Sequence, residues 1–129
     1  CIGYVSALRS LTDAIPELAR KASTEDMRFD AIRPGELDRL SIEITILGAM
    51  EEIGSQKDIT IGEHGLYLEQ GIHRGILLPQ VASDRGWSPD QFLHAVCEKA
   101  MLPFDAWKAE DSTLKRFPAA VFSSKDFSD

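Results

Sequence analysis

Residues 41–47 limit the possible folds more than any other segment, because polar and branched apolar side chains alternate there. The isoleucines fall on one face of the expected strand, and Glu43 and Thr45 fall on the other. Strict alternation of this kind predicts a β-strand, and it is the clearest strand signal in the chain.

Residues 58–79 resemble a meander of three short strands. Glycines at both ends of the two intervening segments predict tight turns, because glycine readily adopts the positive φ that such reversals need. The expected strands are 59–61, 66–69 and 76–78, and the expected turns are 62–65 and 71–75. Residues 1–5 and 113–122 predict a first and a last strand.

Two longer segments have helical spacing of apolar residues. The first covers residues 12–23, and the second begins at Ser88, where Pro89 at the first helical position and Gln91 at the third predict a capping box. Residues 80–85 favour a short helix. Because strands and helices do not alternate as βαβ units, the sequence predicts an α+β fold with a mostly antiparallel sheet and two main helices.

The chain has 129 residues with a formal net charge of −7, which predicts a single domain over residues 1–129. Acidic balance and scattered basic residues disfavour nucleic-acid binding, and no apolar run reaches the roughly 20 residues that cross a membrane. Two cysteines without a signal peptide suggest the cytoplasm. Because the chain begins with Cys1 rather than methionine, we expect its start to be a cut.

Cys1 is the candidate with the most reactive chemistry. A thiol becomes a nucleophile when a nearby cation or base lowers its pKa, and Arg28 and His64 are the candidates for these roles. If Cys1 is a true terminus, its α-amine gives an N-terminal-nucleophile arrangement. The alternative is a small apolar residue that packs at the start of a strand.

Glu43 and His64 are candidate proton carriers. If the polar face of the 41–47 strand is covered, the Glu43 carboxylate needs a partner such as Arg28 or Arg74; if the face is open, Glu43 has no special role. His64 is expected at the tip of a hairpin loop, where it either meets a ligand or is simply solvated.

A metal site is the other chemistry considered. His94, Cys97 and Glu98 share one expected helix, but no further ligands occur at matching spacing, so Cys97 on the apolar stripe is interpreted as a core residue. We expect neither a metal nor a cofactor.

The sequence resembles the AMME chromosomal region protein family, whose microbial members are called AmmeMemoRadiSam system protein A. Cys1-Ile2-Gly3 is similar to the end of its Leu-Arg-Gly-Cys-Ile-Gly signature, and residues 26–29 are similar to its Asp-Pro-Arg-Phe loop. Further similarity follows in family order at residues 36–37, 42–47, 62–66, 77–81, 92–93 and 99–102. Met101 departs from the expected glycine, which calls a left-handed helix cap there into question.

The resemblance implies an α+β domain of two subdomains, with a cleft lined by the signature cysteine, the 26–29 loop and the glycine turn. It also implies that several dozen residues before Cys1 belong to the domain. The family name reflects companionship with a Memo-type protein and a radical S-adenosylmethionine (SAM) enzyme, which are the implied partners. Without three clustered cysteines, the radical chemistry would belong to the companion.

Two functions follow from these observations. As an enzyme-like or accessory component of a modification pathway, the domain would use Cys1 as nucleophile or thiol ligand, Arg28 as anion binder, and Glu43 or His64 as proton carrier on a small-molecule or peptide ligand. As a non-catalytic adaptor, it would present the cleft and the meander to a protein partner.

Overall fold

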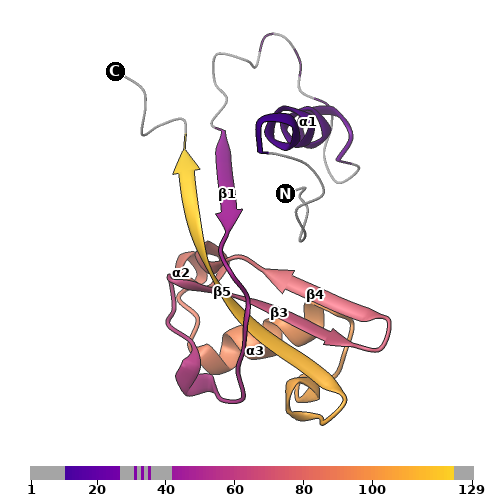
Figure 1. Cartoon of the computed structure of the whole chain (residues 1–129), viewed down its shortest axis with the longest axis vertical. Helices are drawn as coiled ribbons and strands as arrows, with labels where there is room; N and C mark the ends of the chain where they lie inside the picture. The colour runs from indigo at the N-terminus through magenta and orange to yellow at the C-terminus, as the bar shows by residue number, and fades with distance from the viewer. Residues whose placement is uncertain (1–10, 27–30, 32, 34, 36–41, 124–129) are drawn as a thin grey trace. The chain divides into compact units, whose positions relative to one another are not determined.

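The computed structural model describes residues 11–26, 31, 33, 35 and 42–123. Within these residues the chain forms three α-helices and an antiparallel sheet, which confirms the predicted α+β class (Figure 1). Contacts divide the chain into two compact units, one of residues 1–44 with 121–129 and one of residues 45–120. The predicted strand at residues 1–5 lies outside the described residues.

The first unit contains helix α1, Leu11–Thr24, which confirms the helix predicted over residues 12–23. Lys21 lies 3.2 Å from Glu17 one turn earlier, a spacing that stabilises a helix by about 0.2–0.5 kcal/mol. The hydroxyls of Ser23 and Thr24 both donate to the carbonyl of Arg20, each at 2.8 Å. These side-chain hydrogen bonds occupy a carbonyl of the last turn, where the helix ends.

The sheet has the strand order β1-β5-β3-β4, and β2 also pairs with β5. The predicted strands 41–47 and 113–122 are confirmed, as β1 and β5 respectively. The five strands are β1 Glu43–Leu47, β2 Glu51–Glu52, β3 His64–Gln70, β4 His73–Leu77 and β5 Ser112–Ser123.

The predicted strand over residues 59–61 is wrong. Asp58 ends a short 3₁₀ helix, Gln56–Asp58, and its carbonyl accepts a 2.6 Å hydrogen bond from the Arg116 guanidinium. The Thr60 carbonyl accepts from the amides of Glu63 and His64, at 3.1 and 3.0 Å. Because local turns and a side chain occupy these backbone groups, the segment forms no ladder, although Ile59 is still buried.

The two glycine turns also differ from the prediction. His64 and Gly65 belong to β3, so residues 62–65 are not a hairpin loop and His64 is not at a loop tip. The hairpin between β3 and β4 turns at residues 71–72, and Gly75 lies inside β4. A Cβ atom at Gly75 would lie 2.9 Å from the Val96 carbonyl oxygen, so this glycine permits close approach to a helix rather than a reversal.

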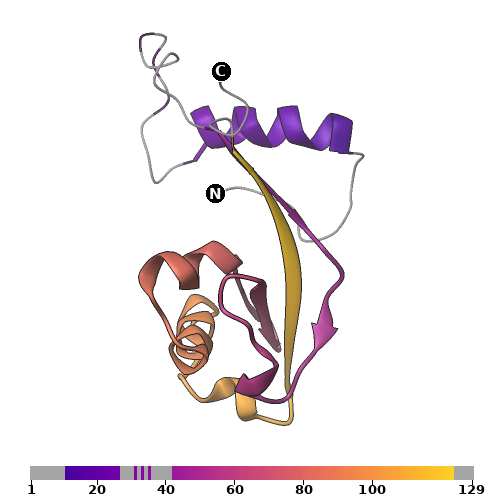
Figure 2. The same cartoon turned by 90° about the vertical axis from the view of Figure 1, so that its left-hand side faces the viewer.

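Helices α2, Pro79–Arg85, and α3, Pro89–Lys99, cover one face of the sheet in the second unit (Figures 1 and 2). The short helix predicted at residues 80–85 is confirmed. So is the capping box of α3: the Ser88 side chain accepts from the Gln91 amide at 3.3 Å, and the Gln91 side chain accepts from the Ser88 amide at 2.9 Å.

Both α2 and α3 end in a Schellman motif. In α2 the left-handed residue is Gly86, with φ 65°, and the Trp87 amide donates to the Ala82 carbonyl at 3.0 Å. In α3 the left-handed residue is Met101, with φ 63°, and the Leu102 amide donates to the Cys97 carbonyl at 2.9 Å. The left-handed cap therefore forms without the glycine expected from the family pattern.

The core of the second unit lies between the sheet and the two helices. Phe92, Leu93 and Val96 of α3 are fully buried against Leu66 and Leu68 of β3. Cys97 is also fully buried in this cluster, which confirms its interpretation as a core residue.

Candidate functional site

Cys1 and Arg28, two of the four predicted site residues, lie outside the described residues. Their common cleft therefore stays a prediction. Of the other two, Glu43 belongs to the first unit and His64 to the second. A site shared by these two residues also stays a prediction.

Glu43 is the first residue of β1, and its side chain is exposed. Arg74, one of the partners suggested for it by the sequence, lies 3.5 Å from Glu69 on the neighbouring strand. Arg74 thus forms an ion pair with Glu69 across the β3–β4 hairpin.

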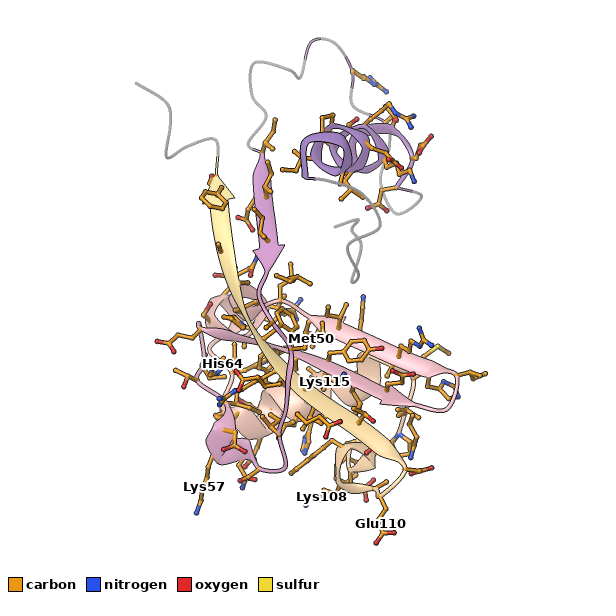
Figure 3. All side chains as sticks on the ribbon, in the orientation of Figure 1. Met50, Lys57, His64, Lys108, Glu110 and Lys115 are labelled. Atoms are coloured by element: carbon orange, nitrogen blue, oxygen red, sulfur yellow. The ribbon has the colours of Figure 1, made fainter. Side chains whose placement is uncertain are left out.

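His64 is the first residue of β3, and its side chain is half-buried (Figure 3). Its Nδ1 atom accepts a 3.0 Å hydrogen bond from the backbone amide of Thr60. In the neutral ring the proton is therefore assigned to Nε2. This contact fixes the orientation of the ring from within the fold and leaves Nε2 as the nitrogen available to a ligand.

A second polar group lies on the face of the sheet opposite α3. Tyr67 and Glu69 are two residues apart on β3 and share this face, and Arg74 of β4 is directly opposite Glu69. The Tyr67 hydroxyl donates to Glu69 Oε2 at 2.9 Å, and Arg74 Nη2 lies 3.5 Å from Glu69 Oε1. We call Tyr67, Glu69 and Arg74 the sheet-face triad.

Electrostatics in the sheet-face triad keep the phenol neutral. Burial raises the pKa of Tyr67 above 10.0, the hydrogen bond to Glu69 raises it further, and the charge of Arg74 acts in the opposite direction. Tyr67 therefore acts as a hydrogen-bond donor, while Glu69 has one oxygen on the phenol and the other on the guanidinium. The triad orients a carboxylate and a cation next to each other on one surface.

His64 is not part of the sheet-face triad. Side chains alternate along β3, so His64 lies on the same side as Leu66 and Leu68, away from Tyr67 and Glu69. The triad is not among the site residues predicted from the sequence, although the alternation in Leu66-Tyr67-Leu68-Glu69 places its tyrosine and carboxylate on one face. The missing information was the register, which requires the turn at residues 71–72 to bring Arg74 opposite Glu69.

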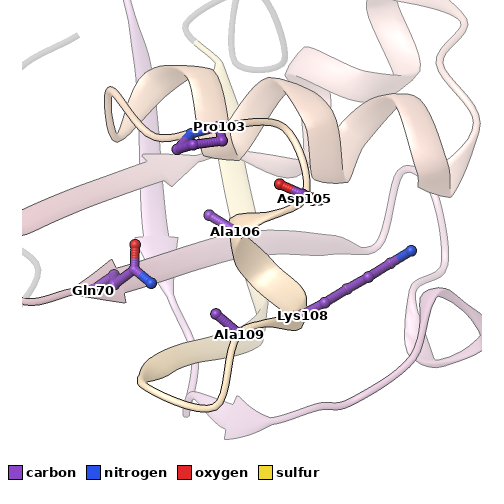
Figure 4. A pocket seen from close by; sticks show the side chains of 6 residues that line it. All are labelled: Gln70, Pro103, Asp105, Ala106, Lys108 and Ala109. Atoms are coloured by element: carbon purple, nitrogen blue, oxygen red, sulfur yellow. The ribbon is translucent and has the colours of Figure 1, made fainter.

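Two shallow hollows lie near the end of α3. One, of about 490 Å³, is lined by His94, Glu98, Leu102 and Phe104. The other, of about 390 Å³, lies between β3 and the segment after α3 (Figure 4), and its lining residues are Gln70, Pro103, Asp105, Ala106, Lys108 and Ala109.

The His94, Cys97 and Glu98 arrangement is divided between core and surface. Cys97 is fully buried, whereas His94 and Glu98 are exposed. Within the described part of the chain, no three His, Cys, Asp or Glu residues are grouped so that they could hold a metal ion. The described helices include none that is long and apolar enough to span a membrane.

The fold defines an α+β domain similar to a solved structure of unknown function. The crystal structure of the uncharacterized protein PH0010 from Pyrococcus horikoshii matches with a TM-score of 0.89 and 35% sequence identity, over 95% of this chain and 63% of that chain. A profile of the AMMECR1 family matches residues 1–122. The chain belongs to the AMMECR1 family, as the resemblance of its motifs predicted.

Two relatives of this chain are archaeal proteins whose names assign no activity. A protein from Aeropyrum pernix is 42% identical over 127 residues, which are 95% of this chain and 55% of that protein. Protein TK0174 from Thermococcus kodakarensis is 38% identical over 130 residues, which are 97% of this chain and 63% of TK0174. The chain thus spans less than two thirds of the length of these two relatives.

Proposed function

We propose that the domain is an enzyme-like or accessory component of a modification pathway linked to a Memo-type protein and a radical SAM enzyme. In this proposal Cys1 is the nucleophile or thiol ligand and Arg28 binds an anionic group of a small-molecule or peptide ligand in a shared cleft. Family membership supports the proposal, because Cys1-Ile2-Gly3 belongs to the signature segment that the resemblance identifies.

The observation that carries the assignment to Cys1 is the environment of the other cysteine. Cys97 is fully buried, and burial raises the pKa of its thiol, with a smaller opposing effect from backbone hydrogen bonds of Trp107 and Ala106. A thiol of this kind is unreactive, because the thiolate is the nucleophile. Of the two cysteines in this sequence, Cys1 is therefore the one to which we assign the thiol chemistry.

His64 and Glu43 are the proposed proton carriers. The amide of Thr60 holds Nδ1 of His64, so Nε2 is the nitrogen that would exchange a proton with a ligand. Glu43 is an exposed carboxylate at the start of β1. The two are alternatives in the proposal, since one proton carrier suffices for a single thiol.

Alkylation rates measured across pH test the proposal. Iodoacetamide is added to the native protein, and peptide mass spectrometry follows each cysteine separately. We expect Cys1 to react with an apparent pKa below the ordinary value of about 8.5, with protection by an added anion and a higher apparent pKa in Arg28→Ala. Cys97 is the internal control and should remain unmodified until the protein is denatured. A Cys1 thiol as slow as Cys97, or one indifferent to Arg28→Ala, contradicts the proposal.

The alternative function is a non-catalytic adaptor. The observation that favours it is a pair of strongly exposed apolar side chains after α3, Met101 at 84% and Phe104 at 65%. Exposed apolar side chains of this size are common where another protein binds. Affinity capture with the native chain tests this function: recovery of the Memo-type companion supports it, and failure to recover that companion at native salt counts against it.

A further inference from the structure

At the end of α3, Met101 has an unfavourable backbone conformation and an apolar side chain that is exposed rather than packed in the domain. Met101 has φ 63°, a left-handed conformation that glycine adopts without penalty and other residues adopt at a cost. Its side chain is 84% exposed, so burial within the domain does not offset that cost.

The other helix cap of this chain has a glycine at the left-handed position, which avoids this cost. Gly86 occupies the equivalent position in the Schellman motif of α2, with φ 65°. The two caps have the same hydrogen bonds, from the left-handed residue and from the residue after it. The methionine at the α3 cap is therefore not required by the motif, and strain of this kind at an exposed position points to a role outside the fold.

The hollow beside this cap is lined by both an aromatic ring and an acidic side chain. Its lining combines the Phe104 ring, which is 65% exposed, with the carboxylate of Glu98. The ring of His94 meets Phe104 edge to face, with centroids 5.1 Å apart and an interplanar angle of 66°, and this contact supports the aromatic wall. An exposed aromatic ring beside a carboxylate is the arrangement that binds guanidinium and ammonium groups.

We propose that Met101, Phe104, His94 and Glu98 form a docking surface for a partner polypeptide segment that carries an apolar side chain next to arginine or lysine. The apolar side chain packs on Met101, whose thioether adapts to different shapes. The basic side chain enters the hollow between Phe104 and Glu98. A net charge of −7 favours the approach of a basic partner.

Charges in the chain segment around the hollow are mixed. Asp105 adds an exposed carboxylate directly after Phe104, whereas Lys99 is an exposed cation directly after Glu98. The surface rests on the adaptor alternative and not on thiol chemistry at Cys1. The two proposals fail separately, because one is measured by peptide binding and the other by alkylation.

Nuclear magnetic resonance titration with two capped peptides tests the surface. The probes are acetyl-Phe-Arg-Leu-amide and acetyl-Phe-Glu-Leu-amide, added to the ¹⁵N-labelled chain at neutral pH. We expect the arginine peptide to bind about tenfold more tightly than the glutamate peptide, with shift changes concentrated at residues 94–105. Glu98→Gln should remove most of this preference, and Glu63→Gln, in the turn before β3, should leave it unchanged.

Met101→Gly separates docking from folding. We expect this variant to bind the arginine peptide about threefold more weakly and to have a higher melting temperature, because glycine relieves the strained cap. Gly86→Met places the same side chain on the α2 cap and should create no new peptide site.

The proposal is overturned by equal binding of both peptides, by shift changes elsewhere on the chain, or by a lower melting temperature for Met101→Gly. Self-association through residues 94–105, measured by sedimentation velocity, also overturns it, because a second copy would then be the occupant.

Discussion

A Cβ atom added at Gly75 would lie 2.8 Å from the amide nitrogen of Ala100, where α3 ends against β4. Both neighbours that it would meet first, this amide and the Val96 carbonyl, are backbone atoms and cannot move aside as a side chain can. We expect Gly75→Ala to lower the free energy of unfolding by about 1–3 kcal/mol, the usual cost of overpacking a core.

Chemical denaturation of Gly75→Ala measures this loss. Gly54→Ala is the matched control, since an added Cβ there meets no atom within 4 Å. A Gly75→Ala protein as stable as Gly54→Ala would mean that α3 does not lie as close to β4 as described.

The two Schellman caps predict opposite effects of reciprocal changes. Met101→Gly should raise the free energy of unfolding by about 0.5–1 kcal/mol, because the relief of left-handed strain exceeds the entropy that glycine adds to the unfolded chain. Gly86→Ala should lower it by about 1 kcal/mol for the same reason. Thermal unfolding of both variants beside the parent protein checks the signs, and a change of the same sign in both contradicts the cap geometry.

Removal of the Tyr67 hydroxyl should weaken the sheet-face triad. Tyr67→Phe leaves one oxygen of Glu69 without its 2.9 Å donor, so we expect a loss of about 1 kcal/mol in unfolding free energy at neutral pH. Denaturant unfolding measures it, with Thr113→Ala on β5, opposite Glu69, as a control for the same face. A loss in Tyr67→Phe no larger than in this control would count against the hydrogen bond.

The raised pKa of Tyr67 predicts a pH dependence at high pH. In the unfolded chain this phenol ionises near 10.0, whereas in the folded chain it keeps its proton to higher pH. Between these two pKa values the native state binds more protons than the unfolded state. The contribution of Tyr67 to stability is therefore fully present below the pKa of the unfolded chain and is lost as the pH rises through the pKa of the folded chain. Tyr67→Phe should therefore lose less stability above about pH 10 than the parent protein.

Ultraviolet absorbance provides a direct measurement of this pKa. The chain has two tyrosines, and Tyr67→Phe leaves Tyr4 alone. The difference between the titration curves of parent and variant therefore reports Tyr67. A midpoint at or below 10.0 in that difference would contradict the burial and the hydrogen bond described for Tyr67.

The capping box of α3 predicts a local effect on stability. Ser88→Ala removes the side-chain acceptor of the Gln91 amide, and we expect a loss of about 1 kcal/mol. Ser83→Ala is the control: Ser83 is exposed within α2 and donates only to the Gln80 carbonyl, so its replacement should change stability by no more than about 0.5 kcal/mol. Equal effects of the two substitutions would show that Ser88 does not act as a cap.

Elements with local signals could be predicted from the sequence. Helix α1 follows from apolar spacing, α3 from Ser88 and Gln91, and β1 from the alternation at residues 43–47. Each of these signals lies within one turn or one strand, so it acts on the backbone whatever the rest of the chain does.

Segments whose structure depends on distant residues could not be predicted correctly from the sequence. Ile59 is apolar and buried as a strand residue would be, yet the Arg116 guanidinium binds the carbonyl of the residue before it, 58 positions away in the sequence. Gly75 looked like a turn residue, but its function in the fold is to let α3 approach β4. In both cases the same residue type fits two structures, and only a tertiary contact distinguishes them.

The family, the α+β class and the assignment of Cys97 to the core could all be predicted from the sequence, because apolar periodicity and ordered motifs are local properties. The tertiary structure alone decided that Tyr67, Glu69 and Arg74 meet on one face, since their contact depends on the register of a hairpin. It also decided that Met101 is exposed in a left-handed cap, because the exposure of a side chain depends on what the rest of the fold places around it.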